Sequence, residues 1–596
     1  MTSGFSLCLE SGERSFRDGR YADAEQALRA ALAIDPRSVK AHFRLGLVLE
    51  RRRKWAEAEA AFRSAIRGKR DHALAWIRLA AACRRQGKER EEDVAAREAV
   101  RWAPRSGEAR QTLAVTLARQ GRTDEAVTAF EEALALAPSN AVAHYGLGVA
   151  LVAKGRHAEA VVAFAHVVRL DRRSYKGHVQ QGEALRHLRR WPEAAAAYRQ
   201  AAGLRPTEPA VHGRLGLVLE RQRRYHEAVA AYTRAARLDA TGARWRARLG
   251  RVLERQGRYA EAESALHDAV RRQPDLLDAH LGLAMIYRRQ GNWAEEARVY
   301  ERAIQLKPDD AHLHADLGLA LEAQGLLGPA EGEFRRAVAL DPDNADLHVE
   351  LGIAMGRQGR HAEAETELRE AVRLNPHDVV ARANLALGLG RQGRHAESEA
   401  AYRQALEVKP DGAALRRGLG MALYSQGKQG EAELAFREAV RLKPGYARAW
   451  GDLGELLTET GRHAEAVETF REAIRVKTHR IASYRGLGAV LLLLGRDAEA
   501  ESVYREALAL RPADSHCHFG LWTALERQGK PTEAEAAYRA AIGVSSDLAE
   551  AHARLGEMLA RQGRWREAEA AFREALRIEP DDARSRAALS AVLRRR

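Results

Sequence analysis

The chain has few cysteines and no long hydrophobic run. Cys8, Cys83 and Cys517 are far apart in 596 residues, which argues against a disulfide framework and favours a reducing compartment, so we expect a cytoplasmic protein. The longest run of leucine, Leu491 to Leu494, is far shorter than the roughly 20 apolar residues of a transmembrane helix. The opening residues, MTSGFSLCLESGER, lack the basic start and apolar centre of a secretory signal.

Motifs of catalysis are also missing. The sequence contains no P-loop, H-E-x-x-H, G-x-S-x-G or paired C-x-x-C pattern. The stretch from Gly388 to Gly393 matches G-x-G-x-x-G, but it neither follows a strand pattern nor opens a βαβ unit. Nothing gathers the many glutamates into one desolvated pocket. We therefore expect no enzyme, no cofactor and no metal site.

A strict repeat fills almost the whole sequence. Seventeen units of 34 residues run from Phe5 to Asp582 without insertion or deletion. An alanine marks each unit at every 34th residue from Ala31 to Ala575, with Val167 as the exception. If each unit is numbered 1 to 34, glycine prevails at positions 8 and 15, alanine at 20 and 27, a large side chain at 24, and proline at 32.

These positions predict two helices in each repeat. Apolar residues at positions 4, 7 and 11 have helical spacing and predict an amphipathic helix over positions 1–14. Glycine at 15 suits a left-handed helix end, and proline at 32 ends a second helix over about 18–31. Small residues at 8, 20 and 27 allow the helices to approach closely, and the large residue at 24 fills the space between them.

The pattern resembles the tetratricopeptide repeat, whose signature has L-G, A-x3-F, A and P at a 34-residue period. The resemblance implies an all-α, right-handed superhelical solenoid of antiparallel helix pairs, with the first helices lining its concave face and more than one superhelical turn. Residues 1–4 are then a short lead, residues 5–582 the array, and residues 583–596 a C-terminal helix that covers the last apolar face. The high excess of arginine over lysine indicates a GC-rich bacterial genome.

Histidine recurs at position 4 of the repeat, where metal binding is the tempting hypothesis. Tryptophan or tyrosine takes the same position elsewhere, and successive histidines are one whole repeat apart, too far to share an ion. We interpret this row as packing residues: His42, His144, His178, His212, His280, His314, His348, His518 and His552.

Charge is distributed unevenly over a chain of net charge +15. Repeats two and three have 18 basic and 9 acidic residues, repeats six to eight have 20 and 11, and repeats nine to twelve have 16 and 23. Three interpretations stay open: decoration of solvated faces, steering of an acidic partner, and self-association between basic and acidic segments. Basic residues alternate with glutamate and no nucleic-acid motif occurs, which disfavours nucleic acid as the partner.

Two groups of apolar residues are the candidate binding site. By the resemblance, positions 2, 5, 9 and 12 of each first helix point into the groove. An apolar groove surface favours docking of an apolar peptide, and the alternative is modest burial without a partner. The first groove patch is Val142, Tyr145, Val149 and Val152, and the second groove patch is Val349, Ile353, Val380, Ala383 and Leu387.

Unusual residues mark two further places. Gly356, Gly388 and Gly390 lie late in first helices, where glycine weakens a helix, and predict a flexible or closely approached segment. Trp522 replaces the glycine of position 8, so we expect either a splayed helix pair or an outward-pointing ring in repeat sixteen.

The functional hypothesis is a non-enzymatic scaffold that binds an extended peptide or partner protein in the groove. Two alternatives are a recruiting or regulatory arm of a glycosyltransferase-like enzyme and a self-assembling structural solenoid. The carboxylate-clamp residues and the asparagine ladder known in some arrays of this family are not reproduced, since Asn384 is the only asparagine at position 6.

Overall fold

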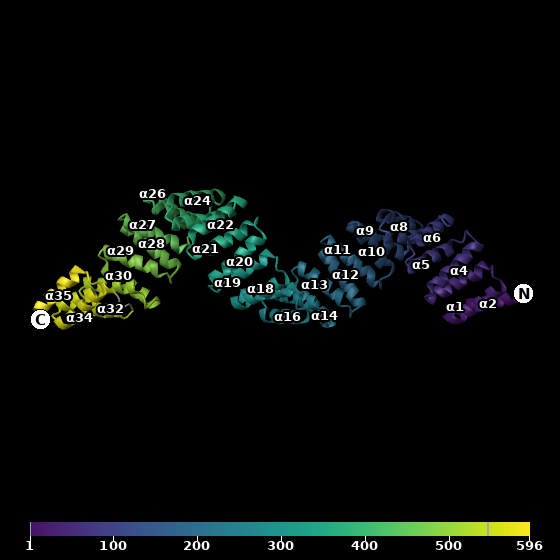
Figure 1. Ribbon diagram of the computed structural model, residues 1–596, viewed down its shortest axis with the longest axis horizontal. Coiled ribbons are helices and arrows are strands. Elements are labelled where there is room, and N and C mark those ends of the chain that lie inside the picture. Colours follow the sequence, from purple (N-terminus) through teal and green to yellow (C-terminus); the bar gives the residue numbers. More distant parts are fainter. Residues whose placement is uncertain (1, 545–547, 596) are drawn as a thin grey trace. The chain divides into compact units, whose positions relative to one another are not determined.

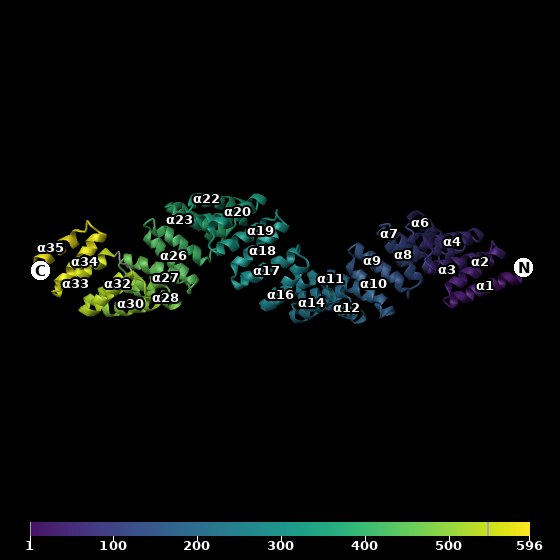
Figure 2. The ribbon, with the colours of Figure 1, turned by 60° about the horizontal axis from the view of Figure 1, so that its bottom comes forward.

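A computed structural model of the protein describes residues 2–544 and 548–595, and all regular secondary structure in these ranges is α-helical (Figure 1). Each repeat forms one antiparallel helix pair, and successive pairs stack side by side within a unit (Figure 1 and Figure 2). The expected all-α helical-repeat fold is therefore confirmed. The chain divides into two compact units, unit 1 (Met1–Leu306) and unit 2 (Lys307–Arg596).

Unit 1 contains the following helices: α1 (Thr2–Arg17), α2 (Tyr21–Ile34), α3 (Val39–Arg51), α4 (Trp55–Gly68), α5 (Ala73–Arg85), α6 (Glu89–Trp102), α7 (Gly107–Arg119), α8 (Thr123–Leu136), α9 (Ala141–Ala153), α10 (His157–Leu170), α11 (Tyr175–His187), α12 (Trp191–Leu204), α13 (Pro209–Arg221), α14 (Tyr225–Leu238), α15 (Ala243–Arg255), α16 (Tyr259–Arg272), α17 (Leu277–Gln290) and α18 (Trp293–Leu306).

Unit 2 contains the following helices: α19 (Ala311–Ala323), α20 (Leu327–Leu340), α21 (Ala345–Arg357), α22 (His361–Leu374), α23 (Val379–Arg391), α24 (His395–Val408), α25 (Ala413–Tyr424), α26 (Gln429–Leu442), α27 (Ala447–Glu459), α28 (His463–Val476), α29 (Ile481–Leu493), α30 (Asp497–Leu510), α31 (Ser515–Arg527), α32 (Pro531–Val544), α33 (Ala549–Arg561), α34 (Trp565–Ile578) and α35 (Ala583–Arg595).

The helix ends follow the turn chemistry of the repeat. In repeat 12, α23 ends at Arg391 and Gly393, at position 15, has φ of 77°, the left-handed value expected of the glycine there. Second helices begin at position 17 and end at position 30, one residue earlier than the sequence predicted. Where position 32 is proline, it pushes the residue before it out of the helical region, and the second helices of the repeats with Arg70, Arg172, Ala240 or Thr478 there end at the same position. Non-glycine residues with positive φ in the described chain are Arg53, Arg189 and Arg223, all at position 15 in unit 1.

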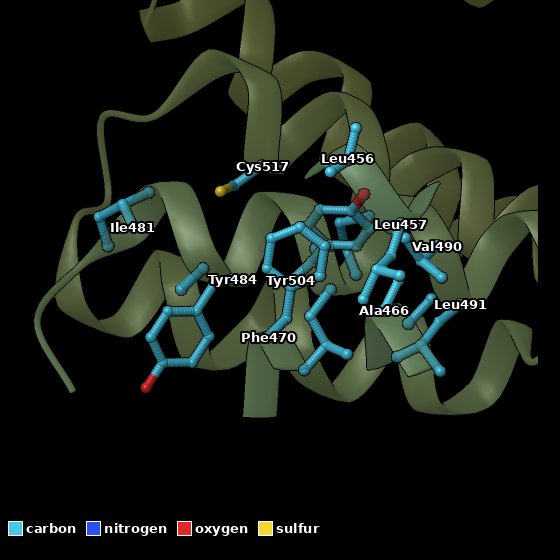
Figure 3. Packing of buried hydrophobic residues seen from close by; sticks show 14 of the residues in the cluster. Leu456, Leu457, Ala466, Phe470, Ile481, Tyr484, Val490, Leu491, Tyr504 and Cys517 are labelled. Atoms are coloured by element: carbon cyan, nitrogen blue, oxygen red, sulfur yellow. The ribbon is translucent and has the colours of Figure 1, made fainter. Parts of the chain in front are cut away.

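The large residue at position 24 fills the space between three helices, as the sequence predicted. In repeat 14 the Phe470 ring lies against Gly454 of its own repeat and Gly486 of the next. A Cβ atom would stand 2.8 Å from this ring at Gly454 and 2.5 Å from it at Gly486, closer than carbon atoms normally approach. Figure 3 shows Phe470 and Tyr504 among the leucine and valine side chains of this core. Glycine at these positions is therefore a packing requirement.

Polar contacts join each repeat to the one before it. Between repeats 11 and 12, Gln392 Nε2 donates to Glu365 Oε2 at 3.0 Å and to the carbonyl of His361 at 3.2 Å. Arg394 Nη1 also donates to Glu365 Oε2, at 2.6 Å. Equivalent glutamine–glutamate pairs recur in the array, so this bond links several neighbouring repeats. They are Gln86–Glu59, Gln290–Glu263, Gln358–Glu331, Gln426–Glu399 and Gln528–Glu501.

The two ends of the chain extend the repeat pattern. Helix α1 begins at Thr2, so it includes residues 2–4, which the repeat phase had left outside the first unit. Helix α35 covers most of the segment predicted as a C-terminal helix, and its Val592 is buried. No helix in the described ranges is long and apolar enough to cross a membrane.

Candidate functional site

The first groove patch lies on α9 of unit 1. Val142 is 61% exposed and Val149 is also exposed. Tyr145 and Val152 are half-buried, and the Tyr145 ring packs edge-on against Phe164 with 5.8 Å between ring centroids. This patch therefore presents two valine side chains to solvent on an otherwise packed helix.

The second groove patch divides into core and surface. Val349 is only 5% exposed and packs with Ala371 and Ala381, so its role in the structure is to hold α21, α22 and α23 together. Ile353 and Ala383 are half-buried. Val380 and Leu387, in contrast, are 56% and 51% exposed on α23, which leaves them the accessible apolar side chains of this patch.

A cavity of about 640 Å³ opens beside the second groove patch, between α21, α22 and α23 of unit 2. We call it the α21–α23 hollow. Apolar side chains and glycines form most of its wall, and two arginines, His361 and Asn384 are its polar members. The wall includes Ile353, Gly356, Leu368, Leu387 and Gly388, together with Arg357 and Arg391.

The hollow exists because side chains are missing from two helices. A Cβ atom at Gly388 would meet nothing within 4 Å, and one at Gly356 would meet only the Cβ of Ala364 at 3.9 Å. Leu368, at position 24, also replaces the aromatic ring that most repeats have there. The sequence had associated these glycines with flexibility or close approach, but at Gly356 and Gly388 the structure has open space.

Two more cavities continue the hollow along unit 2. One, of about 350 Å³, is lined by Leu387, Gly390 and Met421, and the other, of about 560 Å³, by Val380, Asn384 and Tyr446. Leu387 borders the first of these as well as the α21–α23 hollow, and Asn384 borders the second as well as the hollow. The three cavities are thus neighbours that share walls on α23.

The charged groups around the hollow are mostly paired. Arg357 Nη1 lies 2.8 Å from Glu322 Oε1, and Arg417 pairs with Asp452. Arg391 lines both the α21–α23 hollow and the adjacent smaller cavity, and it has no hydrogen bond or ion pair with any residue that the structure describes. Burial, together with the nearby Glu322 carboxylate, raises the pKa of Glu350 on α21.

The histidines of position 4 have a structural role. His144 Nε2 donates to the carbonyl of Pro138 at 2.9 Å, and His348 does the same to Pro342 at 3.0 Å. Trp450 at this position donates its indole N–H to the carbonyl of Pro444 at 2.9 Å. Residues at position 4 therefore pack and also make the same hydrogen bond, because imidazole and indole rings both have an N–H that can donate to the carbonyl six residues earlier. Sequence reasoning missed this bond, although the exchange of histidine with tryptophan was a signal for it.

Trp522 does not point outward. Its indole is buried and lies 4.2 Å from the Tyr538 ring and 4.3 Å from the Phe519 ring, measured between centroids. The outward-ring alternative is therefore wrong, and splaying of this helix pair stays a prediction.

Family models described as "Tetratricopeptide repeat" match most of the chain. One matches residues 9–73, 112–174, 179–243, 247–311, 315–379, 383–447 and 520–583, and a second matches residues 446–513. A search of curated proteins gives no match.

Several solved structures are similar to this chain. The APC/C hetero-tetramer Cut9–Hcn1 shares 13% identity at a TM-score of 0.35, covering 87% of this chain and 96% of that one. Yeast Tom70 shares 16% identity at a TM-score of 0.36, covering 69% of this chain and 98% of that one. YrrB, described as a TPR protein with an unusual peptide-binding site, shares 19% identity at a TM-score of 0.28, covering 31% and 96%.

Proposed function

Because this chain belongs to the tetratricopeptide repeat family, we propose that it is a non-enzymatic scaffold that binds an extended segment of a partner protein along the second groove patch of unit 2. The α21–α23 hollow is the observation that carries this proposal. Ligand sites in proteins are concave and mostly apolar with a few polar groups, and the hollow has this character.

The hollow suits one anchoring side chain of a peptide. Ile353, Leu368 and Leu387 offer an apolar wall, and the absent side chains of Gly356 and Gly388 leave the volume free. Complete burial of an aliphatic side chain is worth about 1.5–3 kcal/mol, which is sufficient for a modest anchor. The two adjacent cavities lie along the same face and would take neighbouring residues of an extended chain.

We place the protein in a reducing compartment, the cytoplasm. Cys8, Cys83 and Cys517 are free thiols, and the latter two are buried. Burial raises the pKa of the Cys83 thiol to about 11, which makes it unreactive at neutral pH.

The proposal is tested with an array of random twelve-residue peptides whose ends are acetylated and amidated. Wild-type protein is compared with Leu387→Asp, which places a charge in the hollow wall. The matched control is Val142→Asp, which places the same charge on an exposed valine of the first groove patch. We expect Leu387→Asp to lose the bound peptides and Val142→Asp to keep them. Equal binding by Leu387→Asp and wild type would contradict the proposed site, and so would an array on which nothing binds.

A further inference from the structure

An ion pair recurs on the first helices of the array. An arginine at position 13 of one repeat pairs with a glutamate at position 12 of the preceding repeat, 35 residues earlier. In unit 2, Arg357 and Glu322 form this pair at 2.8 Å next to the hollow. The described residues include three more such pairs: Arg255–Glu220 at 3.3 Å, Arg289–Glu254 at 3.8 Å and Arg561–Glu526 at 2.8 Å.

The pair is broken at the hollow. Arg391 occupies position 13 of repeat 12, but the residue 35 positions earlier is Gly356, which has no carboxylate. The same glycine that opens the hollow therefore also leaves the Arg391 guanidinium without the kind of partner that Arg357 has in Glu322. Because Arg391 lines the hollow next to Leu387, a free cationic group and an apolar cavity occur at one place.

We propose that this place binds a peptide segment in which an aliphatic side chain and an aspartate or glutamate side chain lie within two residues of each other. The aliphatic group fills the hollow left by Gly356 and Gly388, and the carboxylate takes the position beside Arg391 that Glu322 has beside Arg357. This inference rests on the proposed function and specifies which segment the site selects.

The surrounding charges favour one carboxylate over a run of them. Glu322 is already paired with Arg357, and α21 also carries Glu350. Both acidic side chains repel a peptide with several adjacent acids, whereas Arg391 accommodates a single one. A guanidinium binds a carboxylate through two parallel hydrogen bonds, which also fixes the orientation of the bound segment.

The test uses the strongest blocked peptide from the array that contains an acid next to its aliphatic residue, and a copy in which that acid is changed to the amide. Fluorescence anisotropy with full-length protein measures both affinities. For wild type we expect the amide peptide to bind roughly three- to tenfold more weakly, since a charged hydrogen bond is lost. For Arg391→Gln we expect the two peptides to bind equally.

A second variant supplies the missing carboxylate from the protein itself. Gly356→Glu has room for its side chain and recreates the pair seen at Arg357–Glu322, so the helix pair is expected to fold normally. We expect it to lose the acidic peptide. The control, Ala118→Glu, adds the same charge at position 12 of a repeat in unit 1 and is expected to bind like wild type. Circular dichroism confirms that each variant is folded.

The outcomes separate this inference from the proposed function. If wild type binds the acidic and amide peptides equally, or Arg391→Gln weakens both alike, the role of Arg391 is overturned while peptide binding in the hollow stands. If a copy of the amide peptide with a free C-terminal carboxylate binds through Arg391 and the internal acid does not, the proposed class of segment is wrong. If no blocked peptide binds, both proposals fail.

Discussion

In repeats 14 and 15 of unit 2, the Phe470 ring fills the space beside Gly454 and Gly486, whereas in repeats 11 and 12 the space beside Gly356 and Gly388 stays empty. All four glycines are helical, and all are in the same kind of helix pair. The difference lies in the neighbours. Where a large side chain faces the glycine, the backbone approaches it closely; where none does, the missing Cβ leaves a cavity.

This comparison distinguishes glycines that close packing requires from glycines that have open space beside them. A packing glycine is explained by stability alone, since any side chain would collide with the core. Gly356 and Gly388 weaken their helices and gain no contact in return, and they lie beside exposed Leu387 and Arg391 without a described partner.

The largest effect is expected for a packing glycine. Gly486→Ala would place a methyl group 2.5 Å from the Phe470 ring, and overpacking of this kind costs about 1–3 kcal/mol. Hydrogen exchange of α29 amides, compared with wild type, measures the loss of local stability. Unchanged protection in α29 would remove the distinction between the two classes of glycine.

A substitution in the hollow is expected to act in the opposite direction. Gly388→Ala meets no atom within 4 Å and replaces glycine by a better helix former, so α23 should become more stable by about 0.5–1 kcal/mol. Hydrogen exchange of α23 amides gives the measurement. Destabilisation of α23 by Gly388→Ala would mean that the glycine has a structural role that the open space does not reveal.

The two units differ in how often position 15, where the backbone is left-handed, is glycine. Arg53, Arg189 and Arg223 of unit 1 hold φ near 60° at position 15, where the described repeats of unit 2 have glycine. A left-handed conformation is costly for a residue with a Cβ, so Arg189→Gly should stabilise unit 1 by about 0.5–1 kcal/mol. The midpoint of urea unfolding is the measurement, with Arg186→Gly in the last turn of α11, where Arg186 pairs with Glu183, as a control expected to destabilise. A lower midpoint for Arg189→Gly would contradict the argument.

The smallest effect is a difference in acid sensitivity near the first groove patch. His166 stacks on His144 at 4.6 Å between centroids, and burial, His144 and Arg169 together lower the pKa of His166. The unfolded chain then binds its proton first, so α9–α10 should lose stability as the pH falls below about 6.5. Hydrogen exchange of α9 and α10 amides at pH 7.5 and pH 5.5 measures this loss of stability. In His166→Gln we expect a smaller difference between the two pH values. An equal pH response in wild type and His166→Gln would contradict it.

Most of the fold could be predicted from the sequence, because the same residue types recur at the same positions in nearly every repeat. The glycine at position 15, the large residue at 24 and the proline at 32 gave the helix pairs with bounds correct to within about one residue. The division into two units could not be predicted, since the period continues through Leu306 and Lys307 without a change.

The candidate site was only partly predictable. A rule based on helix positions selected Val380 and Leu387, which are exposed, but also Val349, which is buried. The rule assigns the same exposure to a given position in every repeat, so it could not predict that Val349 packs on Ala371 and Ala381. The hollow and the unpartnered Arg391 both result from the glycines, which lack side chains. That a glycine leaves a cavity or removes a partner can be seen only when the neighbouring helices are placed in space.

The two groove patches also differ at position 12. The first has Val152, half-buried against its neighbours, and the second has Gly356 beside an open cavity. Exposed apolar residues alone therefore form a flat apolar surface, whereas the missing side chain at Gly356 adds a cavity to it. If the cavity is what binds a peptide side chain, a peptide should bind the second groove patch and not the first, although both contain exposed valines.

The most direct measurement of this choice is photo-crosslinking. The aliphatic anchor of the strongest blocked peptide is replaced by a diazirine analogue of leucine, and the crosslinked residues are located by mass spectrometry of the full chain. The account predicts crosslinks to Ile353, Leu387 and their neighbours in the α21–α23 hollow, with none after Leu387→Asp. Crosslinks concentrated at Val142 and Val149 on α9 would contradict it.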